Sequence, residues 1–404
     1  MIYDKEAYLR GLKDVYAQEI REGLGFWAEH GMDWEQGGIV TYLDRDGNWY
    51  CDEKQGWFTG RAMYAFARAY SDVYPDPRFL AAAENLYDFM VRRQFDPATG
   101  KLYHNMTRGG RPIDSDLIPD VTYPAVSTAL HDEGFAVMGL SELYRATGRQ
   151  DVKNTLSRVL DTALFLYRNP RYLIDGTRSE EGALPKPALS TLMTLLCAVQ
   201  TARACDPERE AYYTGLLAGF IEQVMLYYYD AERALISERD IDCPGHSMEV
   251  AWFMLAEGLY TNDRPLIGRC AQVIDTLFEL GWDRARGGGF RLFHNLSGTP
   301  AFSVLQDMKY WWPNSELEAG LMYAYIGTGD ARFLEKFRMA HEWIFAHFPD
   351  REHGEWFGYL DADGRPVSTA KGDNQKGPYH LYRNFCAIYS LIDAYLKKKG
   401  ALRG

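Results

Sequence analysis

The sequence lacks the features that assign a chain to several large classes of protein. It has no apolar run long enough to span a bilayer and no Lys/Arg-rich stripe, and its net charge is −12. These absences argue against a nucleic acid or an anionic membrane as a partner. No His/Cys/Asp cluster has metal-site spacing, and no Gly-rich phosphate loop or GxSxG motif is present. We therefore expect no metal and no cofactor.

The first residues and the cysteines bear on the cellular compartment. Residues 1–6 lack the basic and apolar regions of a secretory signal peptide. The cysteines show no CxxC pair and are interpreted as reduced thiols. They are Cys51, Cys197, Cys205, Cys243, Cys270 and Cys386. We expect a cytoplasmic protein.

Aromatic residues, by contrast, are abundant. They make up 14% of the chain, including 28 Tyr and 10 Trp. Tyr and Trp combine an apolar body with a polar group, so such a surplus suits a cavity that binds polar ligands such as sugars. A large core packed with aromatic side chains would give the same composition, and composition alone leaves both interpretations open.

A turn motif that begins with aspartate recurs along the chain. Its copies start 63, 134, 53 and 67 residues apart, at Asp33, Asp96, Asp230, Asp283 and Asp350. Four copies lead into a short aromatic or β-branched stretch and a second turn, at 42–47, 103–109, 293–298 and 359–364. This layout predicts small β-hairpins. Two histidines in them, His104 and His294, are interpreted as structural.

Between the turns, apolar residues recur at three- and four-residue spacing, which predicts helices. The runs are 5–29, 57–74, 78–94, 131–147, 150–167, 188–204, 208–227, 246–261, 265–280, 314–328, 331–347 and 379–398. Six helix pairs could stack as an open solenoid or close into a toroid. Neither end shows a polar capping repeat, which favours closure. We expect an all-α (α/α)6 barrel with short β-hairpins on the loops, as one catalytic domain over residues 1–404.

Two histidines stand at predicted helix starts. His246 follows Pro244 and Gly245, and His380 ends the segment Gly-Pro-Tyr-His. The first side chains of a helix project into the cavity that the helix mouth faces, and the helix dipole lowers an imidazole pKa there. Two neutral imidazoles facing each other would form a general acid/base pair near pH 7. The alternative is that each histidine merely caps its helix.

Other helix starts carry polar or aromatic side chains that would meet at the same end of a barrel. Glu249 is three residues after His246, so its carboxylate could fix the tautomer of that imidazole. Arg383, one turn after His380, would supply positive charge to an oxyanion, pair with a carboxylate on a neighbouring helix, or do both. The further candidates for substrate binding are Arg61, Glu133, Trp312 and Glu316.

Five segments resemble the N-acylglucosamine 2-epimerase superfamily and occur in that family's order. They are GWFTGR (56–61), PGHSMEVAW (244–252), KYWWPNSE (309–316), GEWFGYL (354–360) and KGPYHLYR (376–383). The resemblance implies an (α/α)6 barrel whose chemistry needs no metal. It also implies acid/base roles for His246 and His380 and contact of Arg61 with substrate oxygens. Glu249 and Glu316 match positions that support a histidine or the substrate.

Two departures from the family pattern concern the substrate. The cellobiose epimerase and mannose isomerase branches carry a further histidine on the helix that matches residues 190–193, where this chain has none. This favours the N-acylglucosamine branch or a mannose-type relative. The N-acylglucosamine branch usually reads Trp-Trp-Pro-His, whereas Asn314 stands here, and residues 371–376 also differ from its usual loop.

The predicted reaction is inversion of C2 in an aldose or an N-acyl hexosamine, foremost of the N-acylglucosamine/N-acylmannosamine type. After ring opening, one histidine would remove the C2 proton to give an enediolate stabilised by Arg61 or Arg383, and the other would return a proton on the opposite face. A mannose/glucose 2-epimerase, or an aldose–ketose isomerase with a single base, is the alternative within the family. We expect a small-molecule sugar as the partner, no nucleic acid or membrane, and a homodimer as one candidate assembly.

Two alternative hypotheses assign the protein to other functional classes. One is an (α/α)6 glycoside hydrolase with paired carboxylates, for which Asp132, Glu133, Glu249 and Glu316 are available. The other is a helical-repeat scaffold, which would present a broad exposed binding face rather than polar groups that converge on a pocket.

Overall fold

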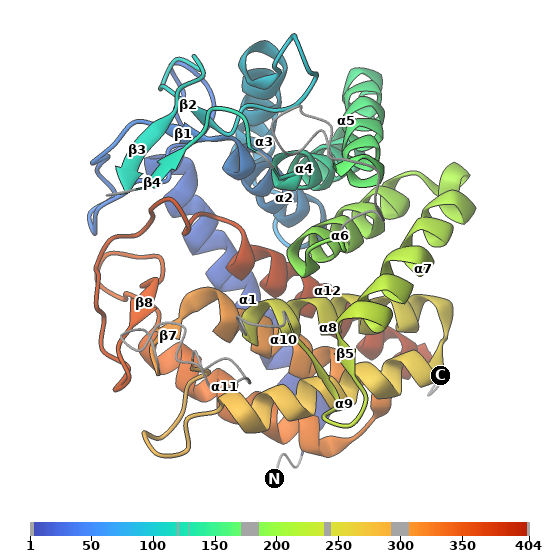
Figure 1. Ribbon diagram of the computed structural model, residues 1–404. Helices are drawn as coiled ribbons and strands as arrows, with labels where there is room; N and C mark the ends of the chain where they lie inside the picture. The colour runs from blue at the N-terminus through green and yellow to red at the C-terminus, as the bar shows by residue number, and fades with distance from the viewer. Residues whose placement is uncertain are drawn as a thin grey trace. The chain divides into compact units, whose positions relative to one another are not determined.

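The computed structural model describes residues 4–118, 121–127, 129–170, 186–237, 244–291 and 307–401. Within these ranges the chain forms twelve α-helices, which confirm the twelve predicted runs (Figure 1). Two compact units are present: unit 1 is Met1–Gly23, Gly219–Thr369 and His380–Gly404, and unit 2 is Leu24–Ala218 and Ala370–Tyr379. The predicted hairpin at 293–298, with His294, and Cys243 lie outside the described residues. None of the described helices has the length and apolar character needed to cross a membrane.

Unit 2 is built on helices α2, α4 and α6, with α4 in the middle. Helix α4 contacts α2 and α6, while α3 packs on α2 and α5 packs on α4. The helices are α2 (Gly56–Asp72), α3 (Pro77–Phe89), α4 (His131–Thr147), α5 (Gln150–Arg168) and α6 (Leu189–Cys205). Glycines let α2 and α4 approach closely, because a Cβ at Gly60 would lie 2.4 Å from the backbone carbon of Phe135.

Unit 1 repeats this arrangement. Helix α10 contacts α8 and α12, while α9 packs on α8 and α10, and α11 packs on α10. The helices are α8 (Pro244–Thr261), α9 (Arg264–Gly281), α10 (Trp311–Thr328), α11 (Ala331–His347) and α12 (His380–Ala401). Helix α10 begins three residues before its predicted start at 314, because Pro313 is tolerated in a first helical turn.

The two remaining α-helices have residues in both units. They are α1 (Lys5–Phe26) and α7 (Glu210–Tyr227). Two π-helical segments, η1 (Trp27–Gly31) and η2 (Met90–Gln94), extend α1 and α3, and a 3-10 turn, η4 (Pro207–Arg209), precedes α7. The predicted runs 5–29 and 78–94 therefore each cover an α-helix and most or all of its π-helical extension.

The helices fall into two classes by how they begin. Helices α3, α9 and α11 start with an aspartate N-cap whose carboxylate accepts a backbone N–H: Asp76, Asp263 and Asp330. The residues that precede α2, α4, α5, α6 and α10, all within the described ranges, form no side-chain cap. The first N–H groups of these five helices are thus not satisfied by a capping side chain.

The five predicted turns are confirmed. In each, the carboxylate of the first aspartate accepts a hydrogen bond from the backbone N–H two or three residues later, at Asp33, Asp96, Asp230, Asp283 and Asp350. Antiparallel bridges close the turns into hairpins, as between Met32 and Ile39. The recurring sequence motif therefore has one physical cause: the aspartate carboxylate stabilises the turn by accepting a hydrogen bond from the backbone that follows it.

Strand pairing also joins hairpins that are far apart in the sequence, which was not predicted. Strand β1 (Lys54–Gln55) pairs with β2 (Asn105–Met106), and β7 (Lys309–Tyr310) pairs with β8 (Tyr359–Leu360). The local pairs are β3 (Ser115–Ile118) with β4 (Val121–Tyr123), and β5 (Tyr229–Asp230) with β6 (Leu235–Ile236). Because β1 and β7 directly precede α2 and α10, the long-range pairs fix where those helices begin.

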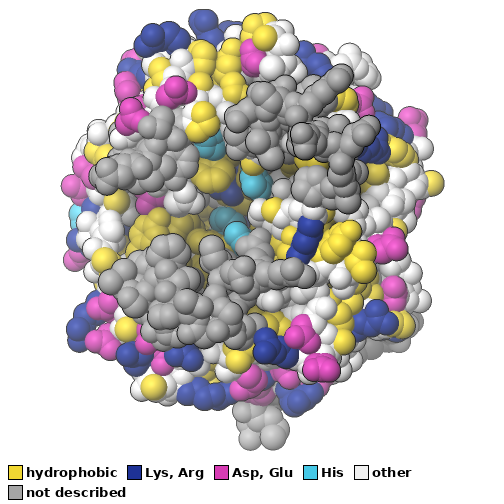
Figure 2. Space-filling view, viewed as in Figure 1, with side chains coloured by type: hydrophobic (Ala, Val, Ile, Leu, Met, Phe, Trp, Pro, Cys, Tyr) yellow, Lys and Arg dark blue, Asp and Glu magenta, His cyan; other side chains and the backbone are white. Residues whose placement is uncertain are grey.

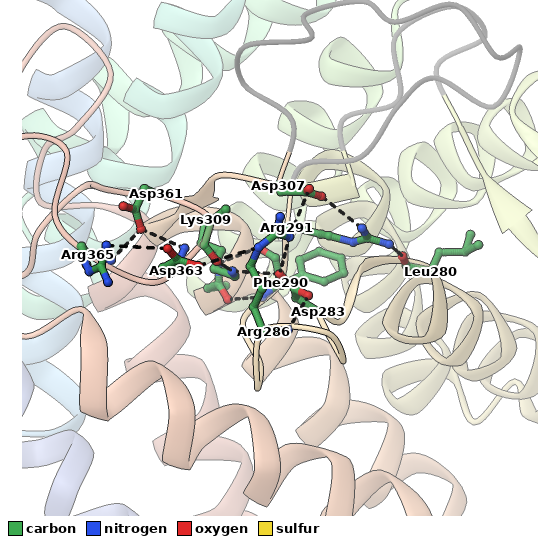
Figure 3. Close-up of polar contacts among 12 residues, drawn as sticks. Leu280, Asp283, Arg286, Phe290, Arg291, Asp307, Lys309, Asp361, Asp363 and Arg365 are labelled. Atoms are coloured by element: carbon green, nitrogen blue, oxygen red, sulfur yellow. Dashed lines mark hydrogen bonds and ion pairs between the residues drawn. The ribbon is translucent and has the colours of Figure 1, made fainter.

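A buried lysine anchors each long-range pair to the aspartate of a turn. Nζ of Lys54 donates to Oδ2 of Asp33 at 2.8 Å, and Nζ of Lys309 donates to Oδ2 of Asp283 at 3.0 Å. Figure 3 shows the second pair, where Arg286 also contacts Asp283. All four paired groups are at most 2% exposed, so each lysine neutralises a carboxylate that burial would otherwise destabilise.

Candidate active site

The two predicted acid/base histidines lie in unit 1 and contact the same indole. His246 is in the first turn of α8, and His380 is the first residue of α12. The centroid of each imidazole lies 5.2 Å from that of Trp312, with interplanar angles of 39° and 37°. The centroids of the two imidazoles are therefore at most 10.4 Å apart, twice 5.2 Å.

Gly245 explains the Pro-Gly sequence before His246. A Cβ at this position would lie 2.2 Å from Cζ3 of Trp312. Only glycine lets the backbone of α8 come this close to the indole. The glycine thus sets His246 beside Trp312.

Glu316 orients His380. Its Oε1 lies 2.8 Å from Nδ1 of His380, and its Oε2 accepts a hydrogen bond from Nε1 of Trp252 at 2.8 Å. Since a carboxylate accepts, Nδ1 of His380 carries the proton and Nε2 is the basic nitrogen. Burial raises the pKa of Glu316, against the opposing effect of Arg383. Trp252 was not predicted as a site residue, although a buried indole N–H generally needs an acceptor.

Arg383 lies between two buried carboxylates. Its Nη1 donates to Oε1 of Glu249, and its Nη2 donates to Oε1 of Glu316. Its Nε donates to Oδ1 of Asn384 at 3.1 Å, and the residue is 1% exposed. This confirms the second of the two expectations for Arg383, a pair with a carboxylate on a neighbouring helix. The guanidinium links α8, α10 and α12 at their first turns.

Glu249 forms no hydrogen bond with His246, and the prediction that it fixes the tautomer of this imidazole was wrong. Oε1 of Glu249 binds Arg383, and its buried Oε2 has no hydrogen-bond partner among the described residues. The i,i+3 spacing shows only that two side chains share a helix face. A guanidinium on α12 is the stronger partner for this carboxylate.

Three groups with metal-binding chemistry come together here. Glu249, Glu316 and His380 each offer one ligand atom, and these atoms lie within 4.8 Å of one another. The guanidinium of Arg383 already binds both carboxylates. A divalent cation would meet this fixed positive charge and displace its hydrogen bonds, so the cluster suits an ion-pair network better than a metal.

Arg61 lies in unit 2, surrounded by aromatic rings. Its guanidinium carbon is 4.0 Å from the ring centroid of Phe135, 4.5 Å from Trp57 and 4.9 Å from Tyr379. The residue is 8% exposed. Such rings stabilise a guanidinium that has lost most of its water, and in this weakly screened setting its charge acts strongly on a neighbouring group. The helix-start position predicted Arg61, but the surrounding rings come from three different segments.

Glu133 also lies in unit 2, at the start of α4. Its Oε1 accepts a hydrogen bond from the backbone N–H of Leu102 at 3.0 Å, and the residue is 1% exposed. Burial, together with the neighbouring Asp132, raises the pKa of Glu133 to about 7. The hydrogen bond from Leu102 to Glu133 joins a hairpin to α4. The substrate contact expected for Glu133 stays a prediction.

Asn314 gives a physical reason for one departure from the family pattern. Its Oδ1 accepts from the backbone N–H of Phe290 at 2.8 Å, and its Nδ2 donates to the carbonyl oxygen of Phe290 at 2.9 Å. The side chain is fully buried. Asn314 therefore pairs like a strand residue with the hairpin beside α10, a task that needs both a donor and an acceptor.

The sequence is similar to proteins of one family along most of its length. The profile of the N-acylglucosamine 2-epimerase (GlcNAc 2-epimerase) family matches residues 37–386. The N-acylglucosamine 2-epimerase of Bos taurus is 30% identical over 410 residues, which cover 96% of this chain and 93% of that protein. The cellobiose 2-epimerase of Dictyoglomus turgidum is 24% identical over 402 residues, which cover 91% and 96%.

Solved structures show the fold. Cellobiose 2-epimerase from Bacillus thermoamylovorans gives a TM-score of 0.77 at 21% identity, covering 93% of this chain and 99% of that one. A D-mannose isomerase gives 0.75 at 15% identity, covering 98% and 100%. A family 76 glycoside hydrolase gives 0.58 at 11% identity, covering 96% and 78%. The (α/α)6 fold class predicted from the sequence is thereby confirmed.

Proposed function

The chain belongs to the N-acylglucosamine 2-epimerase family and is a sugar 2-epimerase, and we propose that it interconverts N-acylglucosamine and N-acylmannosamine. The observation that carries the mechanism is the contact of His246 and His380 with one indole. The proposed inversion needs these two imidazoles on opposite sides of C2 of the bound sugar, so that each serves one face of that carbon. The 30% identity to an N-acylglucosamine 2-epimerase supports the choice of sugar.

In the proposed reaction the sugar first opens, because only the aldehyde form makes the C2 hydrogen acidic. One imidazole takes this proton, and the other returns a proton from the opposite face. Glu316 keeps Nε2 of His380 basic by accepting from Nδ1. Arg61 is proposed to stabilise the enediolate oxygen, because its guanidinium is poorly hydrated. Arg383 positions the two carboxylates, and these proton transfers require no cofactor.

A glycoside hydrolase is less well supported. Inverting and retaining hydrolases both need two carboxyl groups directed at the glycosidic bond. Here Glu249 and Glu316 bind Arg383, Asp132 binds His104, and Glu133 binds the backbone of Leu102. All four candidate carboxylates are therefore already engaged by other groups.

We also propose a cytoplasmic enzyme with one catalytic domain over residues 1–404, a small-molecule sugar as its partner, and a homodimer as its assembly. The described cysteines are free thiols, which suits a reducing compartment. Acidic and basic side chains are interspersed on the face drawn in Figure 2. Its described residues form no continuous basic patch there, in agreement with the proposal that no nucleic acid binds.

The proposal is tested by assaying N-acetylmannosamine, mannose, glucose and cellobiose side by side. The wild-type enzyme is expected to prefer N-acetylmannosamine, and His246→Ala and His380→Ala should each lower kcat by a factor of about 100 or more. His353→Ala, in an exposed turn, is the matched control and should leave kcat unchanged. A preference for free mannose would overturn the proposed substrate. An active His246→Ala or His380→Ala enzyme would overturn the two-base mechanism.

A further inference from the structure

His104 was expected to be structural, but it forms a buried pair with an acid at the start of α4. Nδ1 of His104 lies 3.0 Å from both carboxylate oxygens of Asp132. His104 is 8% exposed and Asp132 is 1% exposed. A carboxylate that binds one nitrogen of an imidazole fixes its tautomer and directs the other nitrogen.

The backbone around this pair leaves it little freedom. The carbonyl oxygen of His104 accepts a hydrogen bond from the N–H of Gly56, the first residue of α2, at 2.6 Å. A Cβ on Gly56 would lie 2.1 Å from the carbonyl oxygen of Tyr103 and 3.0 Å from Oδ1 of Asp132. The glycine that opens α2 therefore makes room for the pair.

Nε2 of His104 is the unused end of the pair. Within the described part of the chain, the side chain of His104 forms hydrogen bonds through Nδ1 alone. Its ring packs edge-on against Trp57, with centroids 5.3 Å apart at 71°. The guanidinium carbon of Arg61 lies 4.5 Å from the ring of the same Trp57. His104 thus shares an indole with the arginine proposed to bind substrate.

We propose that His104, oriented by Asp132, hydrogen-bonds a hydroxyl oxygen of the open-chain sugar through Nε2 and so determines which sugar is accepted. This inference rests on the proposed function, because it places the group beside Arg61 in the same site. Asp132 is a positioning residue that acts through His104. Burial lowers the pKa of His104, but the Asp132 carboxylate more than offsets this and the net pKa is raised. Nε2 therefore carries a proton to donate in a larger share of molecules.

The histidine–carboxylate pair between α10 and α11 provides a matched control. Nδ1 of His341, on α11, lies 2.7 Å from Oε1 of Glu318, on α10. Glu318 is two residues after Glu316, so the two carboxylates point to opposite sides of α10. The ring of His341 stacks on Phe337, with centroids 5.6 Å apart at 13°. This pair joins two helices and has the same chemistry as the first.

The experiment compares His104→Phe, His104→Gln and His341→Phe with the wild-type enzyme. Phe keeps the ring packing and removes the hydrogen bond, and Gln restores a polar amide near the position of Nε2. His104→Phe should raise KM for the preferred sugar about 10- to 100-fold with a smaller change in kcat, and His104→Gln should recover part of this loss. His341→Phe should lower the melting temperature and leave KM unchanged.

Binding of an unreactive alditol, the reduced form of the preferred sugar, separates this proposal from the proposed function. Titration calorimetry should show weaker binding to His104→Phe than to the wild-type protein, whether or not the wild-type protein epimerises the sugar. A wild-type protein that binds alditols without epimerising sugars would contradict the proposed function alone. Unchanged KM, sugar preference and alditol affinity in His104→Phe would show that the pair is structural and overturn the inference.

Discussion

Replacing Glu133 by glutamine should change how the stability of the protein depends on pH. Burial raises the pKa of this carboxyl from 4.5 to about 7, since Oε1 has one backbone donor and Oε2 has none among the described residues. Between these two pH values the unfolded chain ionises Glu133 while the folded chain keeps it protonated. Ionisation then favours unfolding, so the stability of the wild-type protein falls by about 3 kcal/mol as the pH rises through this window.

Glutamine does not titrate, so Glu133→Gln removes this loss. Relative to the wild-type protein, the variant should be more stable at pH 8 than at pH 5 by about 2.5 kcal/mol, or about 3 °C in melting temperature for a chain of this length. Urea denaturation at a series of pH values measures the difference. Glu142→Gln is the control, because that carboxylate accepts from Arg68 and Arg145 and its loss should destabilise at neutral pH. A difference between Glu133→Gln and wild type that stays constant from pH 5 to pH 8 would refute the reasoning.

Three further substitutions test other parts of the account. Arg383→Gln leaves two buried carboxylates without their cation and should lower the free energy of unfolding by about 3–5 kcal/mol, measured by denaturation. Gly56→Ala should cost about 1–3 kcal/mol or more by the same measurement, because its Cβ would lie 2.1 Å from the carbonyl oxygen of Tyr103. Asp33→Asn should destabilise at pH 7, and this cost should shrink progressively as the pH falls below about 4, since the bonds of Asp33 to Lys54 and to an arginine overcome the effect of burial and hold the pKa of Asp33 below its usual range. Unchanged unfolding curves in any of the three would contradict the role given to that residue.

The sequence was sufficient to predict features that arise within one short segment. The aspartate turns could be predicted because each carboxylate accepts a hydrogen bond from the backbone two or three residues further along, as at Asp33 and Asp350. The twelve helices could be predicted because the three- and four-residue spacing of apolar residues is a property of each segment by itself. The positions of His246 and His380 could be read from the turn residues before them.

Contacts between distant segments could not be predicted in the same way. The partner of Glu249 is on α12, and spacing along α8 gave the wrong neighbour. The role of His104 depends on Asp132, 28 residues later, and on a strand pair that joins β1 to β2. Such pairings depend on the register of packed helices and paired strands, which a local pattern does not encode.

The central claim, proton transfer at C2 by two imidazoles, is tested most directly by running the reaction in deuterium oxide. N-Acetylmannosamine is incubated with the wild-type enzyme and followed by proton NMR at early times. The account predicts that the epimeric product carries deuterium at C2 while the remaining substrate keeps its hydrogen, because different bases serve the two faces. Product that retains the original hydrogen at C2, or label that enters substrate and product equally from the start, would contradict it.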